Sequence, residues 1–520
     1  MYQSDVLVIG SGIAGGITAL QLADAGLEVL LVTRSKDPTD SNTYYAQGGI
    51  IYKGKSDSPK LLTKDIILAG ANLNNEKSAY ILAKEGPKLI EDILIKRLNT
   101  SFDRDENGQL SLSLEGGHSI SRIIHSKDAT GKAIEISLIN VLKKHPNVKI
   151  LQNHTAIDLL TMSHHSKDKK KVYLEEECCG AYIFDNETKK VLHAIAKRTV
   201  LATGGIGQIF LRTTNPKGAR GDGLAMASRA RTRIINAEYI QFHPTTFYKE
   251  YGPLFLISEA VRGAGGKLVN KNGATFMEKY SPEWKDLATR DIVARSILNE
   301  MLTKSLSNVY INIYSYLSKN KIKKLFPNIY RKCLENGVDI TQDLIPIVPS
   351  AHYFCGGVWT DEWGKTTIRN LYAVGEVACN GLHGANRLAS ASLLEGLVWG
   401  IRAAKDILNN ITNLFQFNKR DILPWIDTGI EDPDPALIQQ DMNVIKHIMW
   451  NYVGLIRSTK RLDRAIRELR NLEIEIEHFY RISRITDSLI GLRNSVQSAL
   501  IITTAAWKNH NSCGCHYREL

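Results

Sequence analysis

Residues 5–16 read Asp-Val-Leu-Val-Ile-Gly-Ser-Gly-Ile-Ala-Gly-Gly, an apolar strand pattern that runs directly into a G-x-G-x-x-G turn. Residues 17–23 continue with helical spacing, and a second apolar strand pattern covers residues 28–32. In such a strand–turn–helix–strand unit, the glycines permit a tight turn and let a pyrophosphate approach the helix N-terminus. The stretch therefore predicts a dinucleotide-binding domain, although a glycine turn without a ligand can carry the same motif.

The second strand lacks the acidic residue that usually holds the ribose of a dinucleotide at this place. It ends Thr33-Arg34-Ser35, which argues against simple NAD binding. Arg34 would then lie near a phosphate group or the adenine ring of the cofactor, or else be a solvated surface arginine.

A second glycine-rich region lies far along the chain. Residues 371–376 read Leu-Tyr-Ala-Val-Gly-Glu, and residues 382–395 read Leu-His-Gly-Ala-Asn-Arg-Leu-Ala-Ser-Ala-Ser-Leu-Leu-Glu. The first segment has few large side chains, so a flat cofactor can lie against its backbone. The second places His383 and Arg387 four residues apart at an expected helix start, where anions are favoured. We therefore expect a cofactor site and a carboxylate clamp side by side.

The chain divides into three expected units with an α/β fold. A split, Rossmann-like nucleotide-binding domain is expected at 1–237 and 346–423, with an inserted α+β capping domain at 238–345. A Pro/Asp-rich linker at 424–435 precedes residues with helical spacing, so a C-terminal helical bundle is expected at 424–520. A cleft between the first two domains is the expected ligand site.

Length and composition indicate an ordinary globular chain. Its 520 residues allow two or three domains with large cores. No apolar run approaches the roughly 18–20 residues of a membrane helix, and the first strand begins at residue 5, which leaves no room for a signal peptide. The seven cysteines, an odd number, favour a reducing compartment, so we expect a cytoplasmic protein without a membrane partner. The net charge of +12 is spread over scattered lysines, which favours a solvated surface over a nucleic-acid site.

Several residues along the chain are candidates for an anion site. They are His243, Ser258 with the adjacent Glu259, Arg290, His352 and Arg387. Two arginines and two histidines can hold a molecule with two carboxylates, each arginine in bidentate fashion. Taken singly, each also has a structural explanation, because an isolated histidine is more often a core residue and Arg290 can pair with the adjacent Asp291. The spacing alone does not bring these side chains together.

The cysteine patterns do not predict a metal site. Cys513, Cys515 and His516 offer three ligands without a fourth. Cys178 and Cys179 lie on an acid-flanked strand pattern and are expected to be structural. We therefore expect no metal.

Taken together, these motifs make the chain resemble the succinate dehydrogenase/fumarate reductase flavoprotein family. The matching segments follow the family's order over roughly residues 1–405 and are Gly10–Gly15, Thr43–Gly49, Ala202–Gly205, Gly221–Gly223, Phe242–Thr245, Arg290–Arg295, His352–Gly357 and Leu371–Glu395. Within the family, the chain is most similar to the members that oxidise L-aspartate, and its helical tail resembles theirs.

The resemblance implies FAD bound in an extended conformation. By motif match, its contacts are Ser11, Gly12, Ile13, Ala14, Arg34, Asn42, Thr43, Tyr44, Tyr45, Ala46, Gln47, Gly48, Gly49, Asp222, Glu376, Ser392 and Leu393. The resemblance also implies a dicarboxylate cage formed by His243, Ser258, His352 and Arg387, with Arg290 as the proton-transferring residue. An arginine in this role is unusual because its ordinary pKa lies far above neutrality.

Two positions discriminate between members of the family. Asn42 stands where dehydrogenase members carry a histidine bonded covalently to the flavin, so we expect non-covalent FAD. Glu115, in Leu-Glu-Gly-Gly-His-Ser at 114–119, stands where succinate-handling members carry an apolar aromatic residue. A carboxylate facing the substrate accepts a hydrogen bond from an ammonium group and suits succinate poorly. Alternatively, Glu115 is a surface turn residue.

The resemblance therefore implies FAD-dependent oxidation of L-aspartate to iminoaspartate, with oxygen or fumarate as electron acceptor. In the family this is the first step of de novo NAD biosynthesis, and the product passes to quinolinate synthase. The alternative is a succinate dehydrogenase or fumarate reductase flavoprotein subunit. A flavin-bound interaction subunit, docking through the helical tail, is a third interpretation, whereas dispersed basic residues disfavour a nucleic-acid-binding flavoprotein.

Overall fold

The computed structural model of the chain describes residues 1–411 and 419–519. Its largest element is a mixed sheet with the strand order β6-β2-β1-β9-β8-β7, to which β17 adds by pairing with β9. The strands are β1 (Tyr2–Ile9), β2 (Val29–Val32), β6 (Val148–Leu151), β7 (His154–Thr161), β8 (Cys178–Asp185), β9 (Lys190–Leu201) and β17 (Leu371–Ala373). The pairs that involve β1, β2, β6 and β17 are parallel, whereas β7, β8 and β9 are connected as antiparallel neighbours.

Strand β1 is apolar without alternation because both of its faces are covered. Val6 and Val8 belong to the core that includes the adjacent helices, whereas Leu7 and Ile9 belong to the core on the opposite face with Met226. A strand buried on both faces of a parallel sheet reads as a continuous hydrophobic run. The local pattern at the start of the chain thus specifies a central strand.

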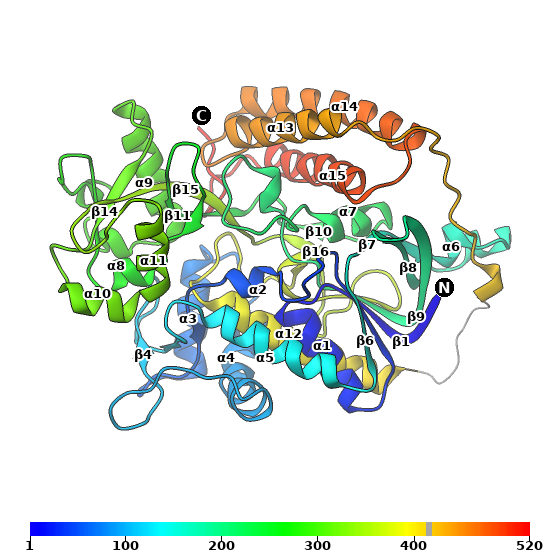
Figure 1. The fold of residues 1–520 in the computed structure, drawn as a ribbon, viewed down its shortest axis with the longest axis horizontal. Coiled ribbons are helices and arrows are strands. Elements are labelled where there is room, and N and C mark those ends of the chain that lie inside the picture. The colour runs from blue at the N-terminus through cyan, green and yellow to red at the C-terminus, as the bar shows by residue number, and fades with distance from the viewer. Residues whose placement is uncertain (412–418, 520) are drawn as a thin grey trace.

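Helices cover both faces of this sheet (Figure 1). On one face, α1 packs against α12 and α5, and α4 packs against α12 and α3. On the other face lies α7, which contacts β7 and the C-terminal helix α15. The helices are α1 (Ile13–Asp24), α2 (Asn42–Tyr45), α3 (Pro59–Ala69), α4 (Glu76–Leu89), a π-helical continuation (Ile90–Arg97), α5 (Thr130–Lys144), α6 (Met162–His165), α7 (Asp222–Arg229) and α12 (Ala391–Asn410).

A smaller antiparallel sheet stands beside the large one, with the order β12-β11-β15-β14-β13. Its strands are β11 (Ile240–Phe247), β12 (Phe255–Leu256), β13 (Lys267–Val269), β14 (Val309–Asn312) and β15 (Ile345–Phe354), and its helices are α8 (Ala260–Gly263), α9 (Arg290–Thr303), α10 (Lys319–Leu325) and α11 (Pro327–Glu335). It has its own core, which includes Phe247, Ile297 and Ile347. Strand β15 begins at residue 345, where the capping domain was expected to end, so His352 lies on this sheet.

Two short sheets complete the connections. One contains β3 (Ile50–Ile51), β5 (Ile123–Ile124) and β4 (Leu112–Ser113), and the other contains β10 (Ile234–Ile235), β16 (Gly357–Trp359) and β18 (Ala378–Cys379). The first of these sheets carries the loop that follows β4, which includes Glu115.

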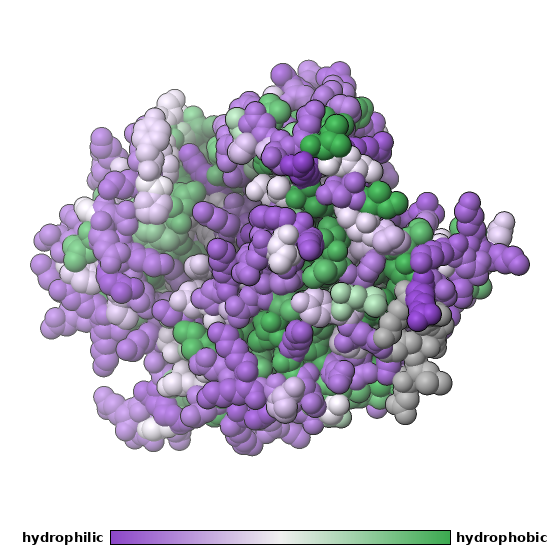
Figure 2. Space-filling view, turned by 45° about the vertical axis from the view of Figure 1, so that its right-hand side comes forward, coloured by the Kyte–Doolittle hydropathy of each residue, from purple (hydrophilic) through white to green (hydrophobic). Residues whose placement is uncertain are grey.

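The C-terminal region is helical, as its spacing predicts. It consists of α13 (Pro435–Tyr452), α14 (Thr459–Ile482) and α15 (Asp487–Lys508), which pack against one another. Ser458 and Thr486 cap α14 and α15, because their side-chain oxygens accept hydrogen bonds from the N–H groups of Arg461 and Leu489. Among the described residues, no helix combines the length and apolar character needed to cross a membrane. Hydrophilic side chains cover most of the face seen in Figure 2.

Candidate active site

One large cavity contains almost all of the residues singled out in the sequence. Of the candidate cofactor and substrate residues, all but one line it. The exception is Tyr44, whose ring contacts Tyr45 at 5.3 Å between centroids and lies under the ammonium group of Lys132. Tyr44 is therefore a neighbour of the cavity wall in the described structure and contacts it through Tyr45.

The first part of the cavity follows the carboxyl ends of parallel strands. Residues 9–14 after β1, 202–205 after β9 and 374–376 after β17 line it side by side. Gly10 has φ +115°, and a Cβ atom on it would lie 2.1 Å from the carbonyl oxygen of Ala202. The main chains therefore meet at a distance that only glycine allows, and this crevice is where doubly wound folds bind nucleotides.

Several buried polar atoms in this part of the cavity lack a partner. Asn42 Oδ1, Gln47 Oε1 and Thr203 Oγ1 have no hydrogen-bond partner among the residues that the structure describes. Buried polar atoms are nearly always paired, so these atoms indicate a polar ligand. A long cofactor with a pyrophosphate and a flat ring fits both the glycine crevice and these atoms.

Asn42 and Glu376 form a polar pair at the middle of the cavity. The Asn42 amide donates to Glu376 Oε2 at 2.6 Å, and the Phe354 N–H donates to Oε1 at 3.0 Å. Burial raises the pKa of Glu376 to about 7 in spite of these two donors. The asparagine amide at position 42 is thus occupied by a neighbouring carboxyl group.

The far end of the cavity involves the C-terminal helices. Arg34 lines the cavity and its Nη1 lies 3.3 Å from Asp487 Oδ2 at the start of α15, so it is not a solvated surface arginine, and its contact with the phosphate or adenine of the cofactor stays a prediction. Asp487 also receives two hydrogen bonds from Arg220, each 3.0 Å long, and Arg220 binds Asp222. Sequence reasoning missed His154 and Thr155, the first two residues of β7, which line this end. Polar residues at the start of a strand offer only a weak signal.

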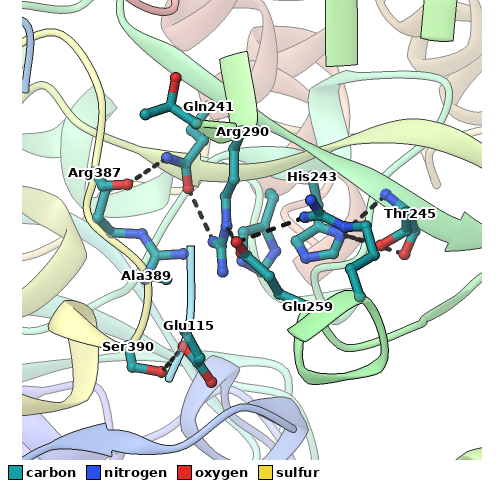
Figure 3. A network of polar contacts seen from close by, with 12 residues as sticks. Glu115, Gln241, His243, Thr245, Glu259, Arg290, Arg387, Ala389 and Ser390 are labelled. Atoms are coloured by element: carbon teal, nitrogen blue, oxygen red, sulfur yellow. Dashed lines mark hydrogen bonds and ion pairs between the residues drawn. The ribbon is translucent and has the colours of Figure 1, made fainter. Parts of the chain in front are cut away.

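The candidate anion binders converge on the other end of the cavity. His243 lies on β11, His352 on β15 and Arg290 at the first residue of α9, while Arg387 follows β18. The two imidazole rings are 4.9 Å apart between centroids. Figure 3 shows the side chains of Arg290, Arg387 and His243 gathered around one space. The structure therefore brings together all four residues, and Ser258 lines the same space.

Both histidines are neutral and present the same nitrogen. His243 Nδ1 lies 3.2 Å from both the backbone nitrogen and the carbonyl oxygen of Thr245, and His352 Nδ1 lies 2.8 Å from the Thr214 hydroxyl. Burial lowers the pKa of His243 and of His352 well below the ordinary value, and nearby arginines lower both further. In the tautomer in which Nδ1 accepts from threonine, each neutral ring carries its proton on Nε2 and has one N–H to donate into the pocket.

Arg290 is held by Glu259 and by Gln241, the second of which sequence reasoning missed. Its Nε donates to Glu259 Oε2 at 2.7 Å and its Nη1 to Gln241 Oε1 at 3.1 Å. Gln241 Nε2 in turn donates to the carbonyl oxygen of Arg387 at 2.8 Å (Figure 3). Asp291, the expected partner of Arg290, instead binds Arg295 at 2.9 Å. The position of Gln241, two residues before His243 on one strand, was the signal that could have found it.

The charges around this space favour an anion. Burial and the charge of Arg290 together lower the pKa of Arg387 to about 10. Burial alone would raise the pKa of Glu259, but the charges of Arg290 and Arg262 hold that pKa below its ordinary value. A buried arginine whose pKa is lowered by a neighbouring cation is stabilised by a ligand of opposite charge.

Glu115 lies inside this pocket and is only 3% exposed. Its Oε2 accepts a hydrogen bond from the Ser390 hydroxyl at 2.6 Å. Gly116 follows it, and a Cβ atom there would lie 2.2 Å from Glu259 Oε1. The loop therefore packs directly against the partner of Arg290, and the surface-turn interpretation of Glu115 is wrong.

His383 is not part of the described lining, and the predicted clamp with Arg387 is wrong in this respect. Its Nε2 lies 2.8 Å from Glu395 Oε2, which also accepts from the Tyr353 hydroxyl at 2.7 Å. The ring of Tyr353 lies under the Arg387 guanidinium, 4.3 Å away. The predicted helix start at residue 383 is also wrong, because α12 begins at Ala391. His383 is thus connected to Arg387 through Glu395 and the ring of Tyr353.

The cysteine-containing end of the chain makes structural contacts. His516 Nδ1 lies 2.6 Å from Arg457 Nη1, and the Cys515 thiol contacts Asn386 Oδ1 at 3.2 Å. All seven cysteines are among the described residues and are free. Within that part of the chain, no group of three or more His, Cys, Asp or Glu side chains could hold a metal ion.

Two family models match the chain. The model described as FAD binding domain matches residues 5–393, and the model described as Fumarate reductase flavoprotein C-term matches residues 442–519. Among curated proteins, L-aspartate oxidase 1 of Ralstonia nicotianae is 44% identical over 99% of this chain and 94% of its own length. The L-aspartate oxidase of Yersinia pestis is 40% identical over 99% of this chain and 95% of its own length.

Solved structures show the same architecture. E. coli quinol fumarate reductase FrdA matches with a TM-score of 0.89 and 25% identity, covering 100% of this chain and 91% of that one. Mycobacterium smegmatis Sdh1 matches with a TM-score of 0.81 and 27% identity, covering 100% and 89%. These matches confirm the predicted fold class, and the family match confirms FAD as the cofactor.

Proposed function

Because the chain belongs to the L-aspartate oxidase family of FAD-binding flavoproteins, as its motifs predict, we propose that it oxidises L-aspartate to iminoaspartate. Oxygen or fumarate is the electron acceptor, and the reaction is the first step of de novo NAD biosynthesis. One observation carries this proposal. The buried carboxylate of Glu115 shares a pocket with Arg290 and Arg387, and these three charges complement two carboxylates and one ammonium group.

The side chains around the pocket divide the binding of aspartate among themselves. Arg290 and Arg387 bind the two carboxylates, and neutral His243 and His352 each add one Nε2–H donor. Ser258 adds a hydroxyl, and Glu115 accepts from the ammonium group. Such a fixed set of partners orients C2 for oxidation.

Bound FAD supplies the acceptor for the two electrons and the hydrogen that leave C2 of aspartate. In this oxidation the C2–H bond breaks, the ammonium nitrogen loses a proton, and a C=N double bond forms. In the reduction of fumarate, Arg290 delivers the proton to carbon. The 2.7 Å ion pair with Glu259, which lies 3.6 Å from Arg262, supports this role because it gives Arg290 a carboxylate for proton exchange.

We assign residues 238–345 to a cap over this pocket. His243, Ser258 and Arg290 come from that segment, whereas Arg387 and Glu115 come from outside it. A site shared in this way excludes water when the two parts are together.

FAD is held without a covalent bond in this proposal. Asn42 carries an amide and no nucleophilic imidazole, and that amide already donates to Glu376. Intact mass measured after denaturation should equal that of the 520-residue chain, with FAD free in solution. A chain heavier by one flavin would contradict this assignment.

The test of the function uses the purified holoenzyme alone. We expect L-aspartate to be oxidised to iminoaspartate while fumarate is reduced to succinate. The iminoaspartate then hydrolyses to oxaloacetate and ammonia. Faster oxidation of succinate than of aspartate would instead favour a succinate dehydrogenase or fumarate reductase flavoprotein subunit, the fold relatives of the chain. Turnover that appears only with an added partner would favour an interaction subunit.

The proposal also includes where the chain is located and which enzyme takes up its product. We assign the chain to the cytoplasm, which its seven free cysteines support. Its product is consumed by quinolinate synthase. If the two proteins exchange iminoaspartate efficiently, quinolinate synthase added together with its three-carbon co-substrate lowers the yield of oxaloacetate, and an unchanged yield contradicts the hand-off.

A further inference from the structure

The two oxygens of the Glu115 carboxylate have different surroundings. Oε2 accepts the hydroxyl of Ser390 at 2.6 Å, whereas Oε1 is buried and has no hydrogen-bond partner within the described parts of the chain. A Cβ atom built on Gly48 would lie 3.6 Å from Oε1 and 3.5 Å from Ser390 Oγ. The carboxylate and Ser390 therefore lie beside the glycine loop, and all three line the same cavity.

Ser390 does not use its hydroxyl in the usual way for its position. It is the residue before α12, where a serine normally accepts a hydrogen bond from the first turn of the helix. In the described structure Ser390 forms no such cap and donates to Glu115. Its backbone is left-handed, with φ 56° and ψ 13°, a conformation that is strained for a residue other than glycine. Ser390 thus adopts an unfavourable backbone conformation while its hydroxyl group donates a hydrogen bond to the Glu115 carboxylate.

A second contact joins the same two segments. His118 Nε2 lies 3.0 Å from the carbonyl oxygen of Ala389, so the neutral ring donates from Nε2. Burial lowers the pKa of His118, in keeping with a neutral ring. Asp65 fixes the other side of the loop, because it accepts from the N–H and hydroxyl groups of Ser119 at 3.0 and 2.9 Å. Hydrogen bonds from His118 and Ser119 therefore hold the loop of Glu115 in place next to Ala389 and Asp65.

We propose that Ser390 is a positioning residue that determines specificity, because it holds Glu115 Oε2 and thereby aims Oε1 at the ammonium group of an amino-dicarboxylate substrate. This inference rests on the proposed function. Without the hydroxyl, Glu115 is free to rotate, and a substrate ammonium group has to order it on binding. Fumarate and succinate carry no ammonium group, so their binding does not depend on this oxygen in the same way.

Two variants of Ser390 separate the hydroxyl from the backbone. Ser390→Ala removes the hydroxyl and keeps the backbone strain, whereas Ser390→Gly removes the hydroxyl and relieves the strain. We expect both to lower the ratio of kcat/KM for L-aspartate oxidation to kcat/KM for fumarate reduction by about tenfold, mainly through KM. The glycine variant should be the more stable of the two by thermal unfolding. A loss of selectivity shared by both variants therefore comes from the hydroxyl.

A binding measurement provides a readout without turnover. Calorimetry with L-2-methylaspartate, which has no hydrogen on C2, and 2-methylsuccinate, which lacks the ammonium group, gives two dissociation constants. We expect the preference for the amino compound to fall about tenfold in both Ser390 variants. Ser458→Ala is the matched control, because Ser458 makes an ordinary cap on α14, and it should lower the unfolding temperature without changing the preference.

Unchanged selectivity in both Ser390 variants would overturn the inference, and so would recovery in Ser390→Gly alone, since strain would then be the cause. These outcomes differ from failure of the proposed function. In that case the wild-type enzyme itself oxidises no L-aspartate and shows no preference for 2-methylaspartate.

Discussion

At the scale of single residues, the pocket holds a buried carboxylate and two buried guanidinium groups. Glu115 is the carboxylate with a free oxygen, and Arg290 and Arg387 are the cations on the opposite side. Because all three are buried, each unmatched charge destabilises the protein until a ligand of complementary charge binds. Aspartate has this charge pattern, whereas succinate leaves Glu115 without a counter-charge.

Replacing Glu115 by Gln should therefore act on one substrate more than on another. We expect kcat/KM for L-aspartate to fall about 100-fold, since a close buried charge pair contributes roughly 2–4 kcal/mol. Fumarate reduction with a reduced viologen dye should fall far less. Steady-state kinetics with both substrates measures this difference, and an equal loss for the two would remove Glu115 as the discriminating residue.

Glu376 should make the stability of the cofactor-free protein depend on pH. Its pKa is about 7 when folded and 4.5 in a free side chain, so between these values the folded chain holds a proton that the unfolded chain has lost. The free energy of unfolding must then decrease as pH rises through this window. Because the side chain faces the cavity, water reduces the effect, and we expect about 2 kcal/mol. Denaturant unfolding at pH 5 and pH 8 should show this decrease in the wild type and a smaller one in Glu376→Gln. Equal decreases would contradict it.

The sequence allowed some of these residues to be predicted and left out others. Asn42 and Glu115 could be identified because they replace family residues whose chemistry differs. Gln241 offered only a weak signal through its place two residues before His243, and Ser390 offered none, because their hydrogen-bond partners lie 49 and 275 positions away. No local pattern encodes such contacts.

At the scale of elements, strands and helix ends bring the site together. β11 and β15 are antiparallel neighbours, and this pairing places His243 beside His352. The N-terminus of α15 reaches the far end of the cavity, where Asp487 binds Arg34 and Arg220. Burial alone would raise the pKa of Asp487, but the charges of Arg220 and Arg34 hold that pKa below its ordinary value.

Asp487→Asn should weaken both this contact and cofactor binding. The change leaves two arginines without part of their counter-charge at a mostly buried position, which costs about 2–4 kcal/mol. We expect a lower unfolding temperature and an FAD dissociation constant raised about tenfold, because Arg34 and Asp222 line the cavity. Fluorescence titration of the cofactor-free protein with FAD measures the second effect.

Asp432→Asn is the matched control for this prediction. Asp432 pairs with Arg484 at 3.0 Å on the surface, where the two side chains are 82% and 59% exposed. Such a pair contributes little, so the control should change neither quantity. If Asp487→Asn behaved like the control, the C-terminal helices would have no energetic connection to the cofactor site.

Element prediction succeeded where the pattern is local and failed where the backbone is irregular. The run at 5–16 and the helical tail have one periodicity over many residues. The segment at 382–390 combines positive φ angles at Gly384 and Ser390, so it turns where a helix was expected and delays α12 until Ala391. That delay directs His383 to Glu395 and leaves Arg387 in the pocket.

At the scale of the whole molecule, the cavity joins two sheets that are distant in sequence. The glycine crevice belongs to the large sheet, and both histidines belong to the small one. Residues 115, 243, 290, 352 and 387 line one cavity, and the small sheet that carries residues 243 and 352 stands beside the large-sheet region (Figure 1). The central claim is that this convergence makes a site for an amino-dicarboxylate next to FAD.

Anaerobic reduction of the bound flavin tests this claim most directly, because it needs neither an acceptor nor a partner. The holoenzyme is mixed with L-aspartate, succinate or L-glutamate at equal concentration, and the loss of flavin absorbance is followed. We predict rapid bleaching by L-aspartate and rates about 100-fold lower for the other two, which lack the ammonium group or have the wrong length. Bleaching by succinate as fast as by L-aspartate, or none by L-aspartate, would contradict the account.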